Sequence, residues 1–116
     1  MAANDYHVIV YQILAYLYAQ LKEGKPIEPK MISSDSWLLE INYSYWLYIM
    51  KSLLELGYIS GIQIQEIGDS DKVRYLNKCQ ITPKGIEYIC DDKMIDKVRD
   101  YVSDKKVIPT NVNLIH

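Results

Sequence analysis

The sequence predicts a small domain of the α+β class, and two of its segments carry the prediction. Residues 53–59 (LLELGYI) are typical of a helix that ends at a glycine and continues directly into a strand. Residues 80–86 (QITPKGI) are typical of a strand that runs into a capped helix. Two short strand-like runs around a polar turn lie between these segments. The order helix, hairpin, helix is that of the second half of a winged helix-turn-helix domain.

The first helix should span residues 5–22, with Asn4 or Asp5 as its N-cap and Gly24 at its end. Apolar side chains cover nearly its whole circumference, which is typical of a helix that is buried on more than one side. In so small a domain, this pattern predicts contact with a second copy of the chain. The residues expected at the interface of the homodimer are Tyr11, Leu14, Tyr18 and Leu21.

A second, short helix should begin at Glu28 or Pro29, because proline is favoured at the first helical position. Its end is left open between Ser33 and Glu40. The third helix should span residues 43–56, with Asn42 as its N-cap.

The inward face of this third helix should carry four apolar residues, namely Trp46, Ile49, Met50 and Leu53. Ile41 and Trp46 have the spacing of a hydrophobic staple. Gly57 fits the left-handed position after the helix, so that Tyr58 can contact Leu53 as in a Schellman ending.

Residues 59–67 alternate apolar and polar side chains, which indicates a strand. Residues 68–71 form a turn and residues 72–81 form the return strand of a β-hairpin, the wing. Thr82 and Pro83 then begin a fourth helix. We expect a break near residues 91–92 and a fifth helix after it. Residues 1–104 are interpreted as one winged-helix domain and residues 105–116 as a mobile C-terminal tail.

Two cysteines, Cys79 and Cys90, lie at no metal-ligand spacing and form no disulfide framework, which predicts a reduced, cytoplasmic protein. The N-terminal residues lack the basic region of a signal peptide. The apolar run from Val8 to Leu21 is too short to span a membrane, so no membrane partner is expected.

The formal net charge of −2, from 13 Lys and Arg against 15 Asp and Glu, bears on the choice of partner. Proteins that bind nucleic acids normally carry excess positive charge, because neutralised phosphates supply much of the affinity. A DNA-binding surface on this chain would therefore have to be a local patch.

In a helix-turn-helix the second helix of the motif lies in the major groove, and here that helix is the one over residues 43–56. Serine and tyrosine can bind phosphate, and lysine can contact phosphate or guanine. The candidate DNA-binding residues are Ser44, Tyr45, Tyr48, Lys51 and Ser52 on the helix and Lys72, Arg74 and Lys78 on the hairpin.

The opposing interpretation of the same residues is a solvated helix face or a protein-contact surface. Glu55, Asp69 and Asp71 lie among the cations in the sequence. If the fold gathers the cations on one side, DNA binding is favoured. If these carboxylates interrupt the cationic surface, binding of a protein partner is favoured.

Catalysis is not expected. His7 and His116 lie near the ends of the sequence, with no Glu, Asp or Cys at ligand spacing, and no glycine-rich phosphate loop follows a strand. We therefore expect no metal, no cofactor and no enzymatic activity.

Residues 51–59 (KSLLELGYI) and 81–89 (ITPKGIEYI) resemble the YjcQ family, small winged-helix proteins of Gram-positive bacteria and their prophages. The resemblance covers roughly residues 8–103. It implies a winged-helix fold and a DNA-binding role, and it assigns no functional residue. Two hypotheses follow: a dimeric DNA-binding transcriptional regulator of phage origin, or a winged helix that binds another protein and does not bind DNA.

Overall fold

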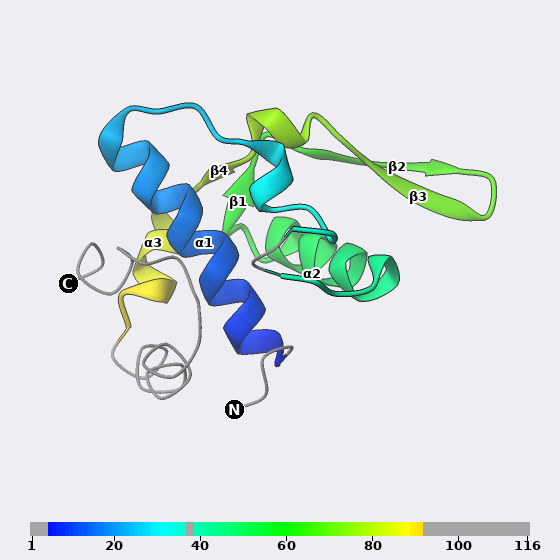
Figure 1. Ribbon diagram of the computed structural model, residues 1–116, viewed down its shortest axis with the longest axis horizontal. Helices are drawn as coiled ribbons and strands as arrows, with labels where there is room; N and C mark the ends of the chain where they lie inside the picture. Colours follow the sequence, from blue (N-terminus) through cyan, green and yellow to red (C-terminus); the bar gives the residue numbers. More distant parts are fainter. Residues whose placement is uncertain (1–4, 37–38, 92–116) are drawn as a thin grey trace.

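The computed structural model describes residues 5–36 and 39–91, and Figure 1 shows their arrangement. The structure is of the mixed α+β class, as predicted. Its elements in chain order are α1 (Tyr6–Glu23), the 3-10 helix η1 (Pro29–Met31), α2 (Tyr43–Glu55), β1 (Ile59–Ser60), β2 (Gln63–Ile67), β3 (Ser70–Arg74), the 3-10 helix η2 (Leu76–Lys78), β4 (Gln80–Ile81) and α3 (Pro83–Ile89). The predicted fifth helix and C-terminal tail lie outside the described residues.

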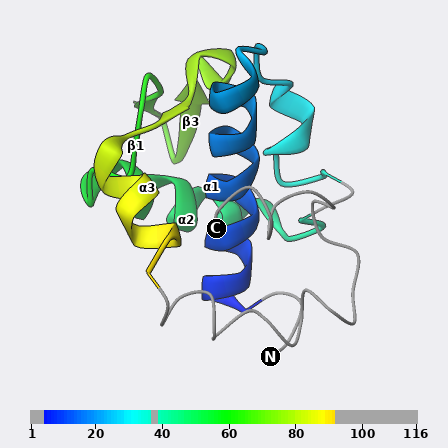
Figure 2. The same ribbon diagram turned by 90° about the vertical axis from the view of Figure 1, so that its left-hand side faces the viewer.

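Helix α1 is the centre of the fold. The Asp5 carboxylate accepts a hydrogen bond from the N–H of His7 at 3.0 Å, and Gly24 ends the helix in the left-handed conformation. Every residue from Val8 to Leu17 is buried. In Figure 2, α1 stands upright between α3 on one side and η1 on the other, and it also contacts α2 and β4. The chain's own elements therefore pack around the apolar circumference of this helix.

The second helix begins at Pro29, as predicted, but it is a 3-10 helix and ends at Met31, before the expected range of residues 33–40. Where that helix was expected to begin, one 3-10 turn forms at Pro29–Met31 and turns follow it. The hydroxyl of Ser33 donates to the carbonyl oxygen of Lys30 at 3.2 Å and lies 2.7 Å from a carboxylate oxygen of Asp35. Side chains of this kind offer the backbone local partners that compete with helical hydrogen bonds. The indole N–H of Trp46 holds the segment by donating to the Ile32 carbonyl at 2.7 Å.

Helix α2 begins and ends as its sequence predicts. The Asn42 side chain accepts a hydrogen bond from the N–H of Tyr45 at 2.8 Å. The predicted inward face is buried, with Trp46, Ile49, Met50 and Leu53. The N–H of Tyr58 donates to the Leu53 carbonyl at 2.9 Å, and the N–H of Gly57 donates to the Leu54 carbonyl at 3.1 Å. These two bonds, with a φ of 81° at Gly57, form the predicted Schellman ending.

The expected long hairpin is divided into two short antiparallel ladders. Strands β1 and β4 pair next to the core, with Ile59 opposite Ile81, and β2 and β3 pair farther out. Gly61 separates the ladders on one side, with a φ of 95°, and a Cβ there would overlap the carbonyl oxygen of Lys78. On the other side, Tyr75 adopts the left-handed conformation and η2 follows. Figure 1 shows the β2–β3 hairpin projecting from the body of the protein beside α2.

The turn of this hairpin is shorter than expected. Ile67 pairs with Ser70, so the turn contains only Gly68 and Asp69. Helix α3 then begins as predicted, because the Thr82 hydroxyl oxygen accepts from the N–H of Gly85 at 3.0 Å. The same hydroxyl donates to the carbonyl oxygen of Gly57 and so ties the start of α3 to the end of α2.

Candidate functional site

The outward face of α2 carries most of the predicted helix residues. It forms an open groove of about 400 Å³, which is lined by Ser44, Leu47, Tyr48, Lys51, Ser52 and Glu55. Tyr48 is 65% exposed, and Ser44 is also exposed. The Ser52 hydroxyl is already engaged, because it donates to the Ile49 carbonyl at 2.9 Å and lies 3.2 Å from the Tyr6 hydroxyl. Ser44 and Tyr48 are therefore the two hydroxyls on this face that are presented to solvent.

Tyr45 lies apart from this groove, on the half-buried shoulder of the helix. Burial raises the pKa of its hydroxyl, and the negative charge of Asp5 adds to the effect. This position makes Tyr45 a less accessible candidate than Tyr48.

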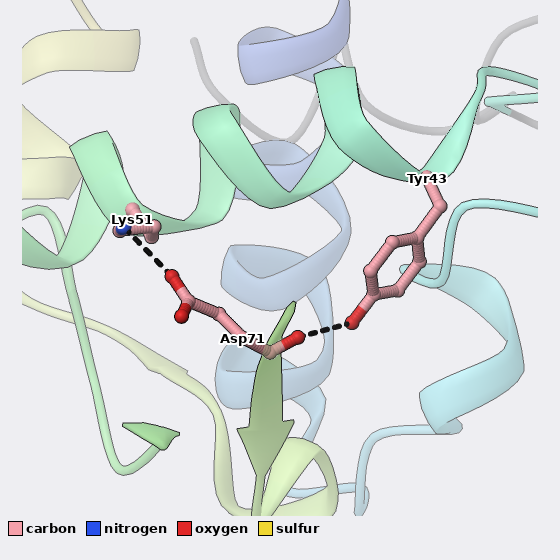
Figure 3. Close-up of polar contacts among 3 residues, drawn as sticks. All are labelled: Tyr43, Lys51 and Asp71. Atoms are coloured by element: carbon pink, nitrogen blue, oxygen red, sulfur yellow. Dashed lines mark hydrogen bonds and ion pairs between the residues drawn. The ribbon is translucent and has the colours of Figure 1, made fainter. Parts of the chain in front are cut away.

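Lys51, the one cation of α2, forms an ion pair with the hairpin. Its Nζ lies 2.9 Å from Oδ2 of Asp71, which follows the first residue of β3 (Figure 3). The hydrogen bond to Asp71, together with the charge of that carboxylate, raises the pKa of the Lys51 ammonium. The carboxylates of Glu66 and Glu55 shift it in the same direction. The positive charge of α2 is therefore matched by a carboxylate of its own chain.

A second contact joins the hairpin to α2 at the same residue. The hydroxyl of Tyr43 donates to the main-chain carbonyl oxygen of Asp71 at 3.1 Å, as Figure 3 shows. Asp71 thus contacts α2 twice, once through its side chain and once through its backbone.

The β2–β3 hairpin separates its charged side chains by face. Side chains alternate along each strand, and directly paired residues share a face. The inner face, which contains Asp71, also contains Glu66 opposite it and the half-buried pair Ile64 and Val73. The outer face contains the pairs Gln63–Arg74 and Gln65–Lys72, and these four side chains are exposed. Among the strand residues of this hairpin, the acidic ones thus lie on the side of α2 and the basic ones on the opposite side.

Gln63 and Gln65 were not among the predicted site residues, although they lie beside Lys72 and Arg74. The alternation of residues 62–67 already placed the two glutamines on one face of a strand. What the sequence did not supply is the pairing that brings this face next to the two cations.

Lys78 is separate from both surfaces. It lies in η2, between the two ladders, with its Nζ 5.6 Å from the centre of the Tyr75 ring. It also lines a smaller cavity of about 140 Å³ between the end of α1 and the segment of η2 and β4. The structure therefore brings Lys72 and Arg74 together and leaves Lys51 and Lys78 apart from them.

The residues predicted for the dimer interface fall into two groups. Tyr11 and Leu14 are 2% and 0% exposed inside the chain, so a second copy could not reach them, and their assignment to an interface does not fit the fold. Burial raises the pKa of Tyr11 to about 12. Tyr18 is half-buried, with the Lys22 ammonium 5.0 Å from its ring centre, and Leu21 is 52% exposed. For these two residues the interface stays a prediction.

No helix within residues 5–36 and 39–91 is long and apolar enough to cross a membrane. In the same ranges, no three side chains of His, Cys, Asp or Glu gather in a way that could hold a metal ion.

The fold and the surface define a small α+β protein. Helix α2 runs into β1, the β2–β3 hairpin projects from the body, and β4 leads into the capped helix α3. The sequence model of the family described as YjcQ protein matches residues 11–107, and the chain belongs to this YjcQ family. No curated protein and no solved structure matches the chain.

Proposed function

We propose that this chain is a non-enzymatic DNA-binding protein of the winged-helix type and acts as a transcriptional regulator. In this proposal the β2–β3 hairpin is the wing and binds the phosphate backbone with its outer face. Helix α2 corresponds to the groove-binding helix. The observation that carries the proposal is the separation of charge on the hairpin, which gives a net acidic chain a local cationic surface.

The outer face has the chemistry that phosphates require. Lysine and arginine neutralise phosphate charge, and the side-chain amides of glutamine donate hydrogen bonds to phosphate oxygens. Lys72 and Arg74 are exposed, and neither shares its face with a carboxylate in the described strands. A phosphate oxygen can therefore approach both cations without meeting a like charge on the outer face of the two strands.

Helix α2 contributes differently. Ser44 and Tyr48 are exposed and can donate to phosphates or base edges, but Lys51 is already paired. The two cations on the outer face of the described hairpin, Lys72 and Arg74, give weak, salt-dependent binding, and two copies on two half-sites would raise the affinity without any new contact. The proposal therefore includes a homodimer on DNA, with Tyr18 and Leu21 as the predicted contact residues still accessible.

The test is fluorescence anisotropy with random-sequence duplex DNA, at low and at moderate salt. The variant Lys72→Glu/Arg74→Glu should lose binding. The matched control is Lys25→Glu/Lys84→Glu, which changes the net charge equally at the end of α1 and in α3, away from the projecting hairpin (Figure 1). Equal losses of DNA affinity in the two double variants would show that binding depends on the net charge of the chain and not on the outer face of the hairpin. No binding by the wild type at low salt would refute the proposal.

A second candidate, protein binding without DNA binding, is favoured by the groove on α2. This groove is lined by Leu47 and by the side chain of Tyr48, a residue that is 65% exposed. The one cation that lines it, Lys51, is paired with Asp71. Tyrosine in such a position suits a protein interface, because its apolar ring is buried while its hydroxyl stays solvated. Under this candidate the wild type binds no DNA, and Tyr48→Asp abolishes capture of a protein partner that Lys72→Glu/Arg74→Glu retains.

A further inference from the structure

Asp71 occupies the position around Lys51 that an anionic ligand would take. A carboxylate oxygen at 2.9 Å from an ammonium nitrogen makes a charge-assisted hydrogen bond, the same kind of bond that lysine makes to a phosphate oxygen. Lys51 points from the groove face of α2, where Ser44 and Tyr48 also lie, toward the inner face of the hairpin (Figure 3). One cation is thus shared between the helix surface and the wing.

The ion pair can be exchanged, because both partners reach solvent. The Lys51 side chain is 40% exposed and the Asp71 side chain 22% exposed. Pairs that are open to solvent contribute little net stability, because the charges are well solvated when apart. A phosphate group brought next to α2 could therefore replace the carboxylate without a large cost to the fold.

The hairpin does not depend on the carboxylate for its position. Tyr43 binds the main-chain carbonyl of Asp71, and a change of the side chain leaves this acceptor in place. The half-buried residues Ile64 and Val73 of the inner face also pack against the core cluster. The carboxylate can thus be removed while the hairpin stays beside α2.

We infer that Asp71 is an intramolecular competitor of the DNA backbone for Lys51. By holding Lys51, it lowers the affinity for DNA and leaves the phosphate contacts to the outer face of the hairpin. The inference rests on the proposed function and deepens it, since it names a residue that limits binding rather than supports it. The ligand class that competes with the carboxylate for Lys51 is the phosphodiester of the DNA backbone.

The test compares four variants with the wild type: Asp71→Asn, Lys51→Met, the double variant Asp71→Asn/Lys51→Met, and Asp69→Asn. The last is the matched control, because it removes the same charge two residues away, in the exposed turn of the same hairpin. Affinity for random-sequence duplex DNA is measured by anisotropy at several salt concentrations. Thermal unfolding of each variant confirms that it is folded.

Asp71→Asn should bind about five- to tenfold more tightly at 0.1 M salt, and the slope of log K against log salt should steepen by about 0.9, as expected for one added phosphate contact. Asp69→Asn should gain less than about twofold, with an unchanged slope. Lys51→Met alone should change the affinity for DNA little. In the Asp71→Asn background, however, it should abolish the gain in affinity. This non-additivity is the signature of a shared partner.

Equal gains in Asp71→Asn and Asp69→Asn would overturn the inference and leave the proposed function standing, because the effect would then come from net charge. A gain that persists in the double variant would overturn it as well. No DNA binding by any of the proteins at low salt would overturn both the inference and the proposed function.

Discussion

The hydroxyl of Thr82 joins the end of α2 to the start of α3, and its removal tests how the fold is held together. Its oxygen accepts a hydrogen bond from the N–H of Gly85 at 3.0 Å and donates one to the carbonyl oxygen of Gly57. Loss of an N-cap side chain costs about 1 kcal/mol. A half-buried carbonyl that loses its donor adds about 1 kcal/mol. Thr82→Ala should therefore lower the free energy of unfolding by about 2 kcal/mol.

Thr82→Ser is the matched control, because it keeps the hydroxyl and removes only a methyl group. Urea denaturation followed by circular dichroism measures both variants. With a denaturant dependence of about 1.5 kcal/mol/M, the midpoint should fall by roughly 1.3 M for the alanine variant and by less than about 0.5 M for the serine variant. Equal shifts in the two variants would refute the reasoning, because the methyl group rather than the two hydrogen bonds would then stabilise the junction.

Three other perturbations test the two ladders, a buried thiol and the hairpin surface. Gly61→Ala should destabilise the chain by about 2 kcal/mol and Gly24→Ala by about 1 kcal/mol in thermal unfolding. Both glycines have positive φ, but only at Gly61 would a Cβ overlap backbone, at the Lys78 carbonyl. Burial raises the pKa of the Cys79 thiol from 9.0 to about 12, so the unfolded chain loses this proton first as pH rises. The contribution of the buried neutral thiol to folding stability is therefore complete below pH 9 and lost by about pH 12. Stability to urea should fall by about 2 kcal/mol between about pH 8 and about pH 10.5, and by less in Cys79→Ala. The slope of log K for DNA against log salt should be about −1.8 per bound copy, from one phosphate contact each of Lys72 and Arg74, and a slope near zero would contradict those contacts.

Local signals in the sequence predicted the elements whose energetics are local. Asp5, Asn42 and Thr82 cap helices as predicted, because a side-chain oxygen and a main-chain N–H two or three residues later meet without help from the rest of the fold. The ending at Gly57 was predicted for the same reason, since a left-handed residue after a helix favours glycine.

The errors arise where distant parts of the chain decide the outcome. The short helix expected from residue 28 or 29 gave way to a 3-10 turn that is held by Trp46, fourteen residues beyond Ile32. The apolar circumference of α1 was interpreted as contact with a second copy of the chain, yet α2, α3 and β4 pack around that helix, so Tyr11 and Leu14 are buried within the chain. The homodimer itself stays a prediction. Periodicity reports that a surface is buried, and it does not report what buries it.

The candidate surface was predicted in its residues but not in its arrangement. Seven of the eight proposed DNA-binding residues lie on α2 or on the β2–β3 hairpin, and Lys78 lies in η2. The pairing of Lys51 with Asp71 depends on a separation of twenty residues and on the register of β3. Register is set by turn geometry together with the pattern of burial, and neither could be fixed from strands as polar as these.

The charge separation on the hairpin follows from its register, and the register follows from the turn. Gly68 has a φ of 60° and is the first of the two central turn residues, the position at which type II′ turns favour glycine. A shift of one residue in β3 would turn Lys72 and Arg74 toward α2 and would place the Asp71 carboxylate on the outer face. The outer face would then carry the negative charge of Asp71, which repels phosphate, and Lys51 would lose its ion-pair partner. Residues 68–69, which belong to neither surface, therefore control both the phosphate contacts proposed for the wing and the competition proposed for Asp71.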